Sequence, residues 1–400
     1  MNRLFFSFCQ VRVGINRGIV FYFEHSFLNI QSIMELKIDR KELLSALTVG
    51  GSLAGRKKVL PILDNVKLRV KGNNLQVVSM DDQSAIQKRV ALLSCDVDGE
   101  FAVCASDFLK AVKALKDPIV SLVYSEEKKT LVIEHLKGNI SLSATSTEDF
   151  PAIKTSGDNA VTFDVASELL FNWLNTSKAF VASDGIRPVM DGMYMDVKNG
   201  RLSVCASDGT KLFTDSIDSD CVEGVSFVVP SNVFSAIQSV INGTIACTVK
   251  VDTTHTVISV EDAKICVRNL EGRYPNFRAV IPASHCIEVE VNKNELVDSI
   301  SRTAICNGTS KVVRMVVLGG TMELNAEDMD FGKSAKETLT CNLNGEGITI
   351  GFKHDAILAS LSSVESENVL LQMTDNTRAI ILKDTEAPNK IMLTMPCMLN

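Results

Sequence analysis

The 400-residue sequence has few aromatic residues and no long uncharged apolar run. Aromatic residues make up 6% of the chain, with a single Trp, whereas Val, Ile, Leu and Thr recur in short runs typical of β-rich proteins. No stretch of 18 uncharged apolar residues occurs, which excludes a membrane-spanning helix. The hydrophobic content of 46% and the modest net charge of −7 exclude an intrinsically disordered chain.

The sequence also lacks paired cysteines and grouped histidines. Its 11 cysteines are scattered and never spaced as C-x-x-C, which argues against a disulfide framework or a zinc site and favours reduced thiols in a cytoplasmic protein. The five histidines stand apart, and the motifs G-x-x-x-x-G-K-[ST], G-x-S-x-G and H-E-x-x-H are absent. We therefore expect no cofactor, no metal and no intrinsic catalysis.

Residues 1–33 differ in composition from the rest of the chain. They contain seven of the 23 aromatic residues and carry a net charge of +2. Arg12 and Arg17 interrupt the apolar run and no small-residue cleavage site follows, which argues against a signal peptide. We expect translation to start at Met34, with residues 1–33 as upstream sequence or a poorly ordered tail. A membrane-surface anchor is the alternative.

The rest of the chain contains three segments that open alike. Their shared Glu-Leu pairs begin at Glu42, Glu168 and Glu295, separated by 126 and 127 residues. Each opening alternates like a strand and then takes on helical periodicity. Asp39 and Asn292 stand three residues before the first and third of these glutamates, the spacing of a helix N-cap.

The similarity continues inside each segment. Strands that stop at an acidic turn are predicted over residues 75–81, 202–208 and 322–328, and second strand-to-helix steps over 101–109, 227–235 and 349–357. Two strands close each segment. The sequence therefore predicts an α+β fold of three repeated domains, each made of two β-α-β-β-β motifs, a pseudo-symmetric arrangement. Composition places the domains at residues 34–152, 160–282 and 284–400.

Four motifs within these repeats carry a family resemblance. They are Val59–Asn65 (VLPILDN), Ala206–Leu212 (ASDGTKL), Leu270–Arg278 (LEGRYPNFR) and Met395–Leu399 (MPCML). With them, residues 34–400 resemble the β subunit of bacterial DNA polymerase III, the sliding clamp. The resemblance implies the DNA clamp fold, in which a head-to-tail homodimer forms a ring of six similar domains, with helices lining the hole and β-sheets outside.

The resemblance also implies a cleft between the second and third domains that takes short peptides from partners. Flexible Met and small residues suit such a cleft because they adapt to several apolar anchors. Thr210-Lys211 and Met398 depart from the family pattern, so we expect a shifted peptide preference. As an alternative, Leu393 and Met395 are simply inward positions of a last strand. The implied cleft residues are Met190, Ser207, Gly209, Lys211, Leu212, Pro275, Val280, Leu393, Met395, Cys397 and Met398.

An acidic chain must gather positive charge locally to contact DNA phosphates. Lys110, Lys113 and Lys116 recur at every third position of a predicted helix, which places three ammonium groups along one helix face. The cluster Arg56-Lys57-Lys58 follows the first helix, where the family carries a DNA-contacting Arg, and Lys178 and Arg187 are the candidates in the second domain. The predicted helix over 231–240 carries no charge. Ordinary solvated surface charge is the competing explanation for these lysines and arginines.

By the same resemblance, the ring closes where Ile140 and Leu142 of one subunit meet Ile305 and Cys306 of the other. The predicted function is a DNA sliding clamp, a non-catalytic processivity subunit of the replicative polymerase. Its expected partners are duplex DNA, the polymerase, the clamp loader, other polymerases and repair proteins. The alternatives are an exported β-rich binding protein and a metal-dependent DNA-processing enzyme using Asp81-Asp82 or Asp328 and Asp330. Turn capping is the preferred explanation of these aspartates.

Overall fold

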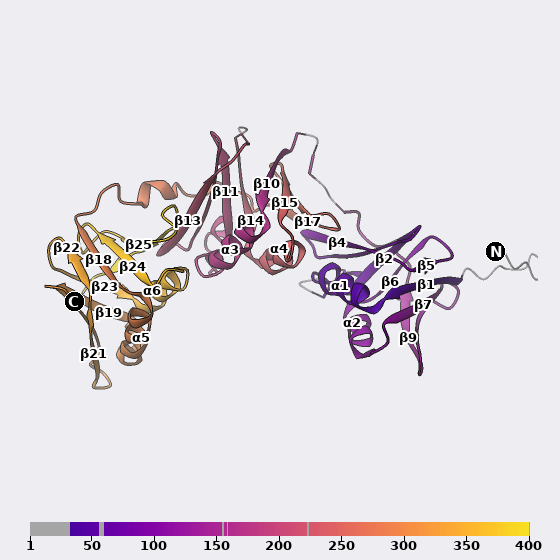
Figure 1. The fold of residues 1–400 in the computed structure, drawn as a ribbon, viewed down its shortest axis with the longest axis horizontal. Helices are drawn as coiled ribbons and strands as arrows, with labels where there is room; N and C mark the ends of the chain where they lie inside the picture. Colours follow the sequence, from indigo (N-terminus) through magenta and orange to yellow (C-terminus); the bar gives the residue numbers. More distant parts are fainter. Residues whose placement is uncertain (1–32, 56–59, 154–155, 158, 222–223, 400) are drawn as a thin grey trace, which may run out of the picture.

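The computed structural model describes residues 33–55, 60–153, 156–157, 159–221 and 224–399. The chain forms an arch of three groups of elements, with β-sheets on the convex side and helices on the concave side (Figure 1). Residues 1–32, which were expected to be upstream sequence or a tail, lie outside the described residues. The first strand begins at Ile33, which pairs with Ser125. Within the described residues, no helix is long and apolar enough to cross a membrane.

Each of the three groups follows the predicted order of two β-α-β-β-β motifs, with short additional strands. The first group contains β1 (Ile33–Asp39), α1 (Arg40–Gly50), β2 (Asn65–Lys71), β3 (Asn74–Met80), β4 (Ser84–Ala91), β5 (Ser94–Cys95), β6 (Gly99–Cys104), α2 (Ala105–Ala114), β7 (Ile119–Ser125), β8 (Thr130–His135) and β9 (Gly138–Thr145). A 3-10 turn, η1 (Pro61–Asp64), precedes β2.

The second and third groups repeat this order. The second contains β10 (Val161–Ala166), α3 (Ser167–Ser177), η2 (Pro188–Met190), β11 (Gly192–Lys198), β12 (Arg201–Ser207), β13 (Lys211–Asp218), β14 (Val225–Pro230), η3 (Ser231–Val233), α4 (Phe234–Ile241), β15 (Ala246–Val251), β16 (His255–Ser259) and β17 (Ala263–Arg268). The third contains β18 (Ile287–Asn292), α5 (Lys293–Thr303), η5 (Ala304–Cys306), η6 (Gly308–Ser310), β19 (Val312–Leu318), β20 (Thr321–Asp328), β21 (Lys333–Thr340), β22 (Asn342–Asn344), β23 (Ile348–Lys353), α6 (His354–Leu361), β24 (Asn368–Met373), β25 (Ile380–Asp384), β26 (Ile391–Thr394) and β27 (Pro396–Cys397), with η4 (Phe277–Val280) between the two groups.

The predicted helix caps are present. The Asp39 carboxylate accepts hydrogen bonds from the Lys41 and Glu42 N–H groups at 2.7 and 3.3 Å. The Asn292 side chain accepts from the two corresponding N–H groups of α5, both at 3.1 Å. Each cap satisfies backbone donors that have no partner inside the helix, so these residues define where α1 and α5 begin.

Helix α2 is shorter than the sequence predicted, and the prediction for Lys116 was wrong. The helix ends at Ala114, and Leu115 already has an extended backbone with ψ of 148°. This conformation turns the Leu115 side chain into the core, where it is 7% exposed. The chain then approaches Pro118, and the residue before a proline disfavours helix. Lys116 therefore lies beyond the helix, and the face keeps only Lys110 and Lys113.

The acidic turns cap themselves as predicted. Asp81 accepts hydrogen bonds from the Gln83 and Ser84 N–H groups at 2.9 and 2.7 Å. Asp208 accepts in the same way from the N–H groups two and three residues later, at 2.8 and 3.0 Å. Asp328 accepts from one N–H of its turn at 3.3 Å. Across the described ranges, no group of three or more His, Cys, Asp or Glu residues is placed to hold a metal ion.

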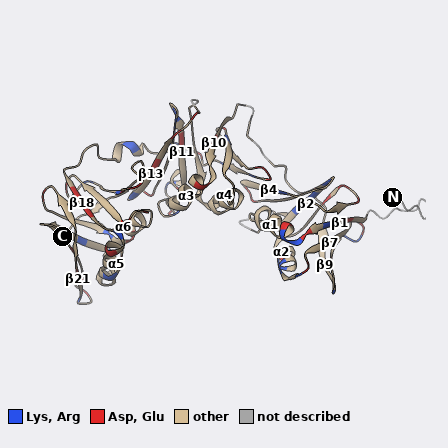
Figure 2. Cartoon of the chain, in the orientation of Figure 1, with Lys and Arg blue, Asp and Glu red and all other residues tan. Residues whose placement is uncertain are grey.

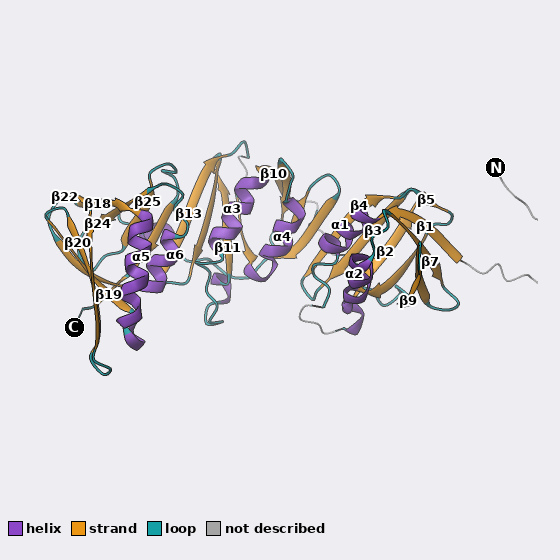
Figure 3. Ribbon diagram, turned by 60° about the horizontal axis from the view of Figure 1, so that its bottom comes forward, coloured by secondary structure: helices purple, strands orange, loops and turns teal. Residues whose placement is uncertain are grey.

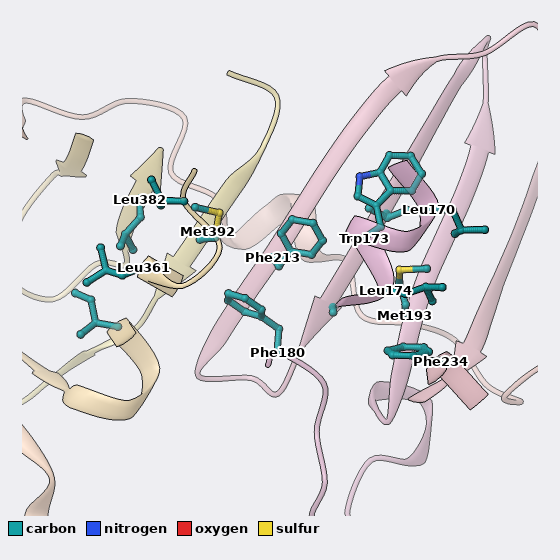
Figure 4. Close-up of a cluster of buried hydrophobic side chains, with 14 of the residues drawn as sticks. Leu170, Trp173, Leu174, Phe180, Met193, Phe213, Phe234, Leu361, Leu382 and Met392 are labelled. Carbon is teal, nitrogen blue, oxygen red and sulfur yellow. The ribbon is translucent and has the colours of Figure 1, made fainter. Parts of the chain in front are cut away.

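The sheets continue from one group into the next. Strand β17 of the second group pairs with β4 of the first, and β13 of the second pairs with β26 of the third. The apolar core also crosses the second junction, where Phe213 lies opposite Met392 in the register and 5.9 Å from the Phe180 ring (Figure 4). Shared ladders and a shared core hold neighbouring groups in fixed positions. Two smaller clusters of buried residues lie at the two junctions.

The turn between β15 and β16 anchors the connection from the first to the second group. The Asp252 carboxylate accepts hydrogen bonds from the N–H groups of Gly157, Thr254 and His255 at 2.6, 2.7 and 2.8 Å. Burial acts to raise the pKa of Asp252, but these hydrogen bonds to the charged form outweigh it and lower the pKa from 3.8 to about 2.

This anchor predicts a specific pH dependence. Because the pKa is lowered in the folded state, Asp252 stabilises the fold fully above about pH 4 and loses this effect as the pH falls towards about 2. We expect Asp252→Asn to lower the melting temperature by a few degrees at neutral pH. The difference from the parent should shrink between about pH 4 and about pH 2 in thermal unfolding followed by circular dichroism. A melting-temperature difference between parent and variant that stays constant over that pH range would contradict the lowered pKa of Asp252.

Candidate functional site

An apolar cleft opens where β13 of the second group meets β26 of the third. Its volume is about 250 Å³. Leu212 and Leu393 face each other across the β13–β26 ladder, and both are 2% exposed. Met190, from η2, is 3% exposed. The cleft brings together nine of the predicted residues, namely Met190, Ser207, Gly209, Lys211, Leu212, Pro275, Val280, Leu393 and Met395.

A connecting segment that includes η4 forms one wall of this cleft. Tyr274 stacks on Tyr194 with ring centroids 4.8 Å apart, and Phe277 meets the same Tyr194 ring edge-on at 6.0 Å. Desolvation by burial raises the pKa of both Tyr274 and Cys205, so the groups behind this wall stay neutral at physiological pH. The stacked aromatics hold the segment in place and leave Val280, which is 53% exposed, at the cleft mouth.

The opposite rim of the cleft carries positive charge. Arg187 lines the cleft, with its Nη1 atom 3.8 Å from the Met190 Sδ atom. Arg187 was expected among the DNA-facing residues, and the structure places it in the lining of the cleft. Gly209 has a φ of +91°, and a Cβ there would lie 3.1 Å from the Arg187 guanidinium, so a glycine suits this turn. Lys211 also lines the cleft, with its Nζ atom 3.5 Å from an Asp208 carboxylate oxygen.

Two of the predicted cleft residues lie elsewhere. Cys397 belongs to β27, where it pairs with Gly351 of β23, and it is not part of the cleft lining. Met398 is 87% exposed beyond that strand. The structure adds Arg187, Thr210, Tyr274, Asn276 and Phe277 to the lining. The motif at 270–278 was the available signal for the aromatic wall, but only the folded segment shows which of its residues turn inward.

The remaining DNA-facing candidates that the structure describes lie on a helix or directly after one. Lys110 and Lys113 lie on α2, on the concave side of the arch (Figure 2 and Figure 3). The Lys110 side chain is 76% exposed and lies 3.7 Å from Asp107. Lys178 follows α3 and donates a hydrogen bond to Gln238 of α4 at 2.6 Å. The cluster 56–58 lies outside the described residues. Helix α4 carries no charge, as the sequence indicated.

The four residues expected at a subunit contact lie near the two ends of the arch. Ile140 and Leu142 are half-buried on β9, and Ile305 and Cys306 lie on η5, where Ile305 is 75% exposed. Strand β9 pairs with β8 along most of its length and with β6 only at its last two residues. Strand β21, beside η5, is the edge strand of its sheet. Each end therefore presents backbone groups that a further strand can pair with.

Comparisons with known proteins agree with this architecture. The sequence profile of the N-terminal domain of the DNA polymerase III beta subunit matches residues 34–154 of this chain. The profile of the C-terminal domain of that subunit matches residues 278–398. The chain is 25% identical over 367 residues to the beta sliding clamp of Escherichia coli, covering 91% of this chain and 99% of that protein. It is 23% identical over 369 residues to that of Pseudomonas aeruginosa, with coverages of 91% and 99%.

Solved structures show the same fold. The sliding clamp of Pseudomonas aeruginosa bound to griselimycin superposes with a TM-score of 0.87 at 22% identity, covering 92% of this chain and 100% of that one. The DNA polymerase III beta subunit of Thermotoga maritima superposes with a TM-score of 0.85, also at 22% identity and with the same coverages. These likenesses, at low sequence identity, establish the clamp fold.

The repeated module, the helix-lined concave face and the junction cleft together define a DNA sliding clamp, a class of protein that performs no catalysis of its own. The chain belongs to the family of DNA polymerase III beta subunits. It is thus a processivity factor that works with DNA and a DNA polymerase. The comparisons give no support to the alternative readings as a metal-dependent enzyme or an exported binding protein.

Proposed function

We propose that two copies of this chain close head to tail into a ring around duplex DNA in the cytoplasm. Each copy comprises domains at residues 34–152, 160–282 and 284–400. The arch supports this proposal, because its helices face the concave side and its two ends offer different strands (Figure 1). One end offers β9, which is paired with β6 at only two residues, and the other offers the edge strand β21. A head-to-tail contact between unlike ends closes when two arcs complete a turn. The apolar residues at this contact are Ile140, Leu142, Ile305 and Cys306.

The cleft between the second and third domains is the proposed tether for the replicative polymerase, the clamp loader, other polymerases and repair proteins. The observation that carries this proposal is the pairing of a buried apolar floor with a cationic rim. Leu212 and Leu393 suit Leu or Phe anchors of an extended peptide, while Arg187 and Lys211 suit its carboxylates or amide oxygens.

Retention on circular DNA tests the proposed ring. The protein loaded on a DNA circle should stay bound until the circle is cut. Release from intact circles would contradict encirclement.

DNA contact through the concave helices should be weak and dependent on salt. We expect Lys110→Gln with Lys113→Gln to weaken direct duplex binding and to reduce the slope of log K against log salt concentration by about 2, one for each lost phosphate contact. Fluorescence anisotropy across a salt series measures both. Matched variants at Lys71 and Lys198, which are exposed lysines at strand ends, should leave the slope unchanged. Equal effects from both pairs would mean that only overall charge matters.

A further inference from the structure

We propose that the junction between the first and second domains holds a second peptide-binding groove, which takes an extended segment with apolar anchors flanked by lysine or arginine. This groove is the pseudo-symmetric counterpart of the cleft at the next junction. The inference rests on the proposed function of that cleft and adds a second site of different charge. Its lining includes Leu60, Leu63, Met80, Ala85, Ala152 and Cys266.

Corresponding backbone hydrogen bonds form at the two junctions. At the cleft, the Asp208 N–H donates to the Lys211 carbonyl at 3.4 Å and the Met395 N–H donates to the Thr210 carbonyl at 2.8 Å. At the groove, the N–H groups of Asp81 and Arg268 make the corresponding bonds to the Ser84 and Gln83 carbonyls, both at 3.0 Å. The turn and the strand from the following domain therefore meet in one geometry at both places.

The side chains that form the floor also correspond. Ala85 lies opposite Cys266 across β4 and β17, as Leu212 lies opposite Leu393 across β13 and β26. Leu63 of η1, which is 4% exposed, takes the place of Met190 of η2. Pro151 and Ala152 of the connecting segment replace the wall formed by residues 274–280.

Smaller floor residues make the groove the larger of the two sites. Alanine and cysteine stand where the cleft has two leucines, and the groove measures about 440 Å³ against about 250 Å³ for the cleft. Leu60, at its mouth, is 45% exposed. Burial raises the pKa of the Cys266 thiol to about 11, so this residue acts as a neutral apolar surface. The groove thus offers room and apolar surface for two large side chains.

The two sites differ in the sign of their charge, and this difference selects the occupant. The charged residues lining the cleft are the cations Arg187 and Lys211. Those lining the groove are the carboxylates of Asp81 and Asp82 with one cation, Arg268. Each site has one cation paired with a neighbouring carboxylate, Arg268 with Glu271 at 2.5 Å and Lys211 with Asp208 at 3.5 Å, so these ion pairs leave the contrast between the sites unchanged. An acidic rim favours a peptide that carries lysine or arginine beside its apolar anchors.

Two ten-residue probe peptides test the inference. Both carry the core Leu-Ser-Leu-Phe, flanked on each side by three lysines in one and by three glutamates in the other. In calorimetric titrations of the full chain, Leu60→Asp should weaken the lysine-flanked peptide at least tenfold, whereas Met395→Asp, at a cleft residue of similar exposure, should leave it unchanged. The glutamate-flanked peptide should show the reverse pattern.

Two controls keep the test independent of folding and of net charge. Leu93→Asp places the same charge at a 58% exposed leucine outside the groove lining and should affect neither peptide. A lysine-flanked peptide with a serine core should not bind. Loss of the lysine-flanked peptide on Met395→Asp, equal loss on Leu93→Asp, or no binding at all would overturn the second groove. Failure of the proposed cleft can be distinguished from failure of the second groove, because the affinity of the glutamate-flanked peptide would then be unchanged by Met395→Asp.

Discussion

Replacing Ile305 by aspartate is expected to convert the ring dimer into folded monomers that are not retained on circular DNA. Ile305 is an isoleucine with 75% of its surface exposed in the isolated chain, so the proposed partner surface is what would bury it. A carboxylate buried there without a partner costs about 4 kcal/mol, which raises the dimer dissociation constant about a thousandfold at each contact. Sedimentation velocity measures the subunit state, and gel filtration of loaded DNA circles measures retention.

A matched variant separates this effect from a general effect of charge. Leu318→Asp changes a leucine that is 70% exposed on the same domain but outside the proposed contact, and should stay dimeric. Leu142→Asp, on the other side of the contact, should also give monomers. Leu142 packs partly against the core of its own domain, so the melting temperature of the Leu142→Asp variant must be compared with that of the parent protein. A stable dimer of Ile305→Asp would show that the ring closes elsewhere.

Replacing Met395 by aspartate is expected to abolish stimulation of the polymerase while loaded rings still slide. Met395 is 41% exposed at the cleft, so the substitution alters the peptide site with little disturbance of the core. A carboxylate at this position opposes apolar anchors and should weaken a Leu- and Phe-containing polymerase tail about a hundredfold, the effect of losing roughly 3 kcal/mol at an interface hot spot. Calorimetry with the tail peptide and primer extension on a long template measure the two effects.

Met398 provides the control for this prediction. The family resemblance implies a role for this residue in the cleft, whereas the structure places it outside the lining and 87% exposed. Met398→Asp should therefore leave both peptide affinity and polymerase stimulation near the parent values. A loss as large as that of Met395→Asp would show that the chain end folds over the bound peptide.

The sequence by itself determined the features of this protein that depend on neighbouring residues. The caps at Asp39 and Asn292 and the self-capped turns at Asp81 and Asp208 rest on hydrogen bonds between residues two or three positions apart, and the threefold repeat can be read directly from the sequence. Alternation and helical periodicity also act over short distances, so they predicted the order of strands and helices in each domain. The family motifs extended this knowledge to most of the cleft.

Only the tertiary structure decided where distant segments meet. The cleft exists because Leu212 pairs with Leu393, far along the chain, and that pairing brings Met395 beside the turn at Thr210. The groove between the first and second domains follows from the same physics. No local pattern encodes it, because it forms only when β17 docks on β4 and repeats the geometry of the cleft with smaller side chains.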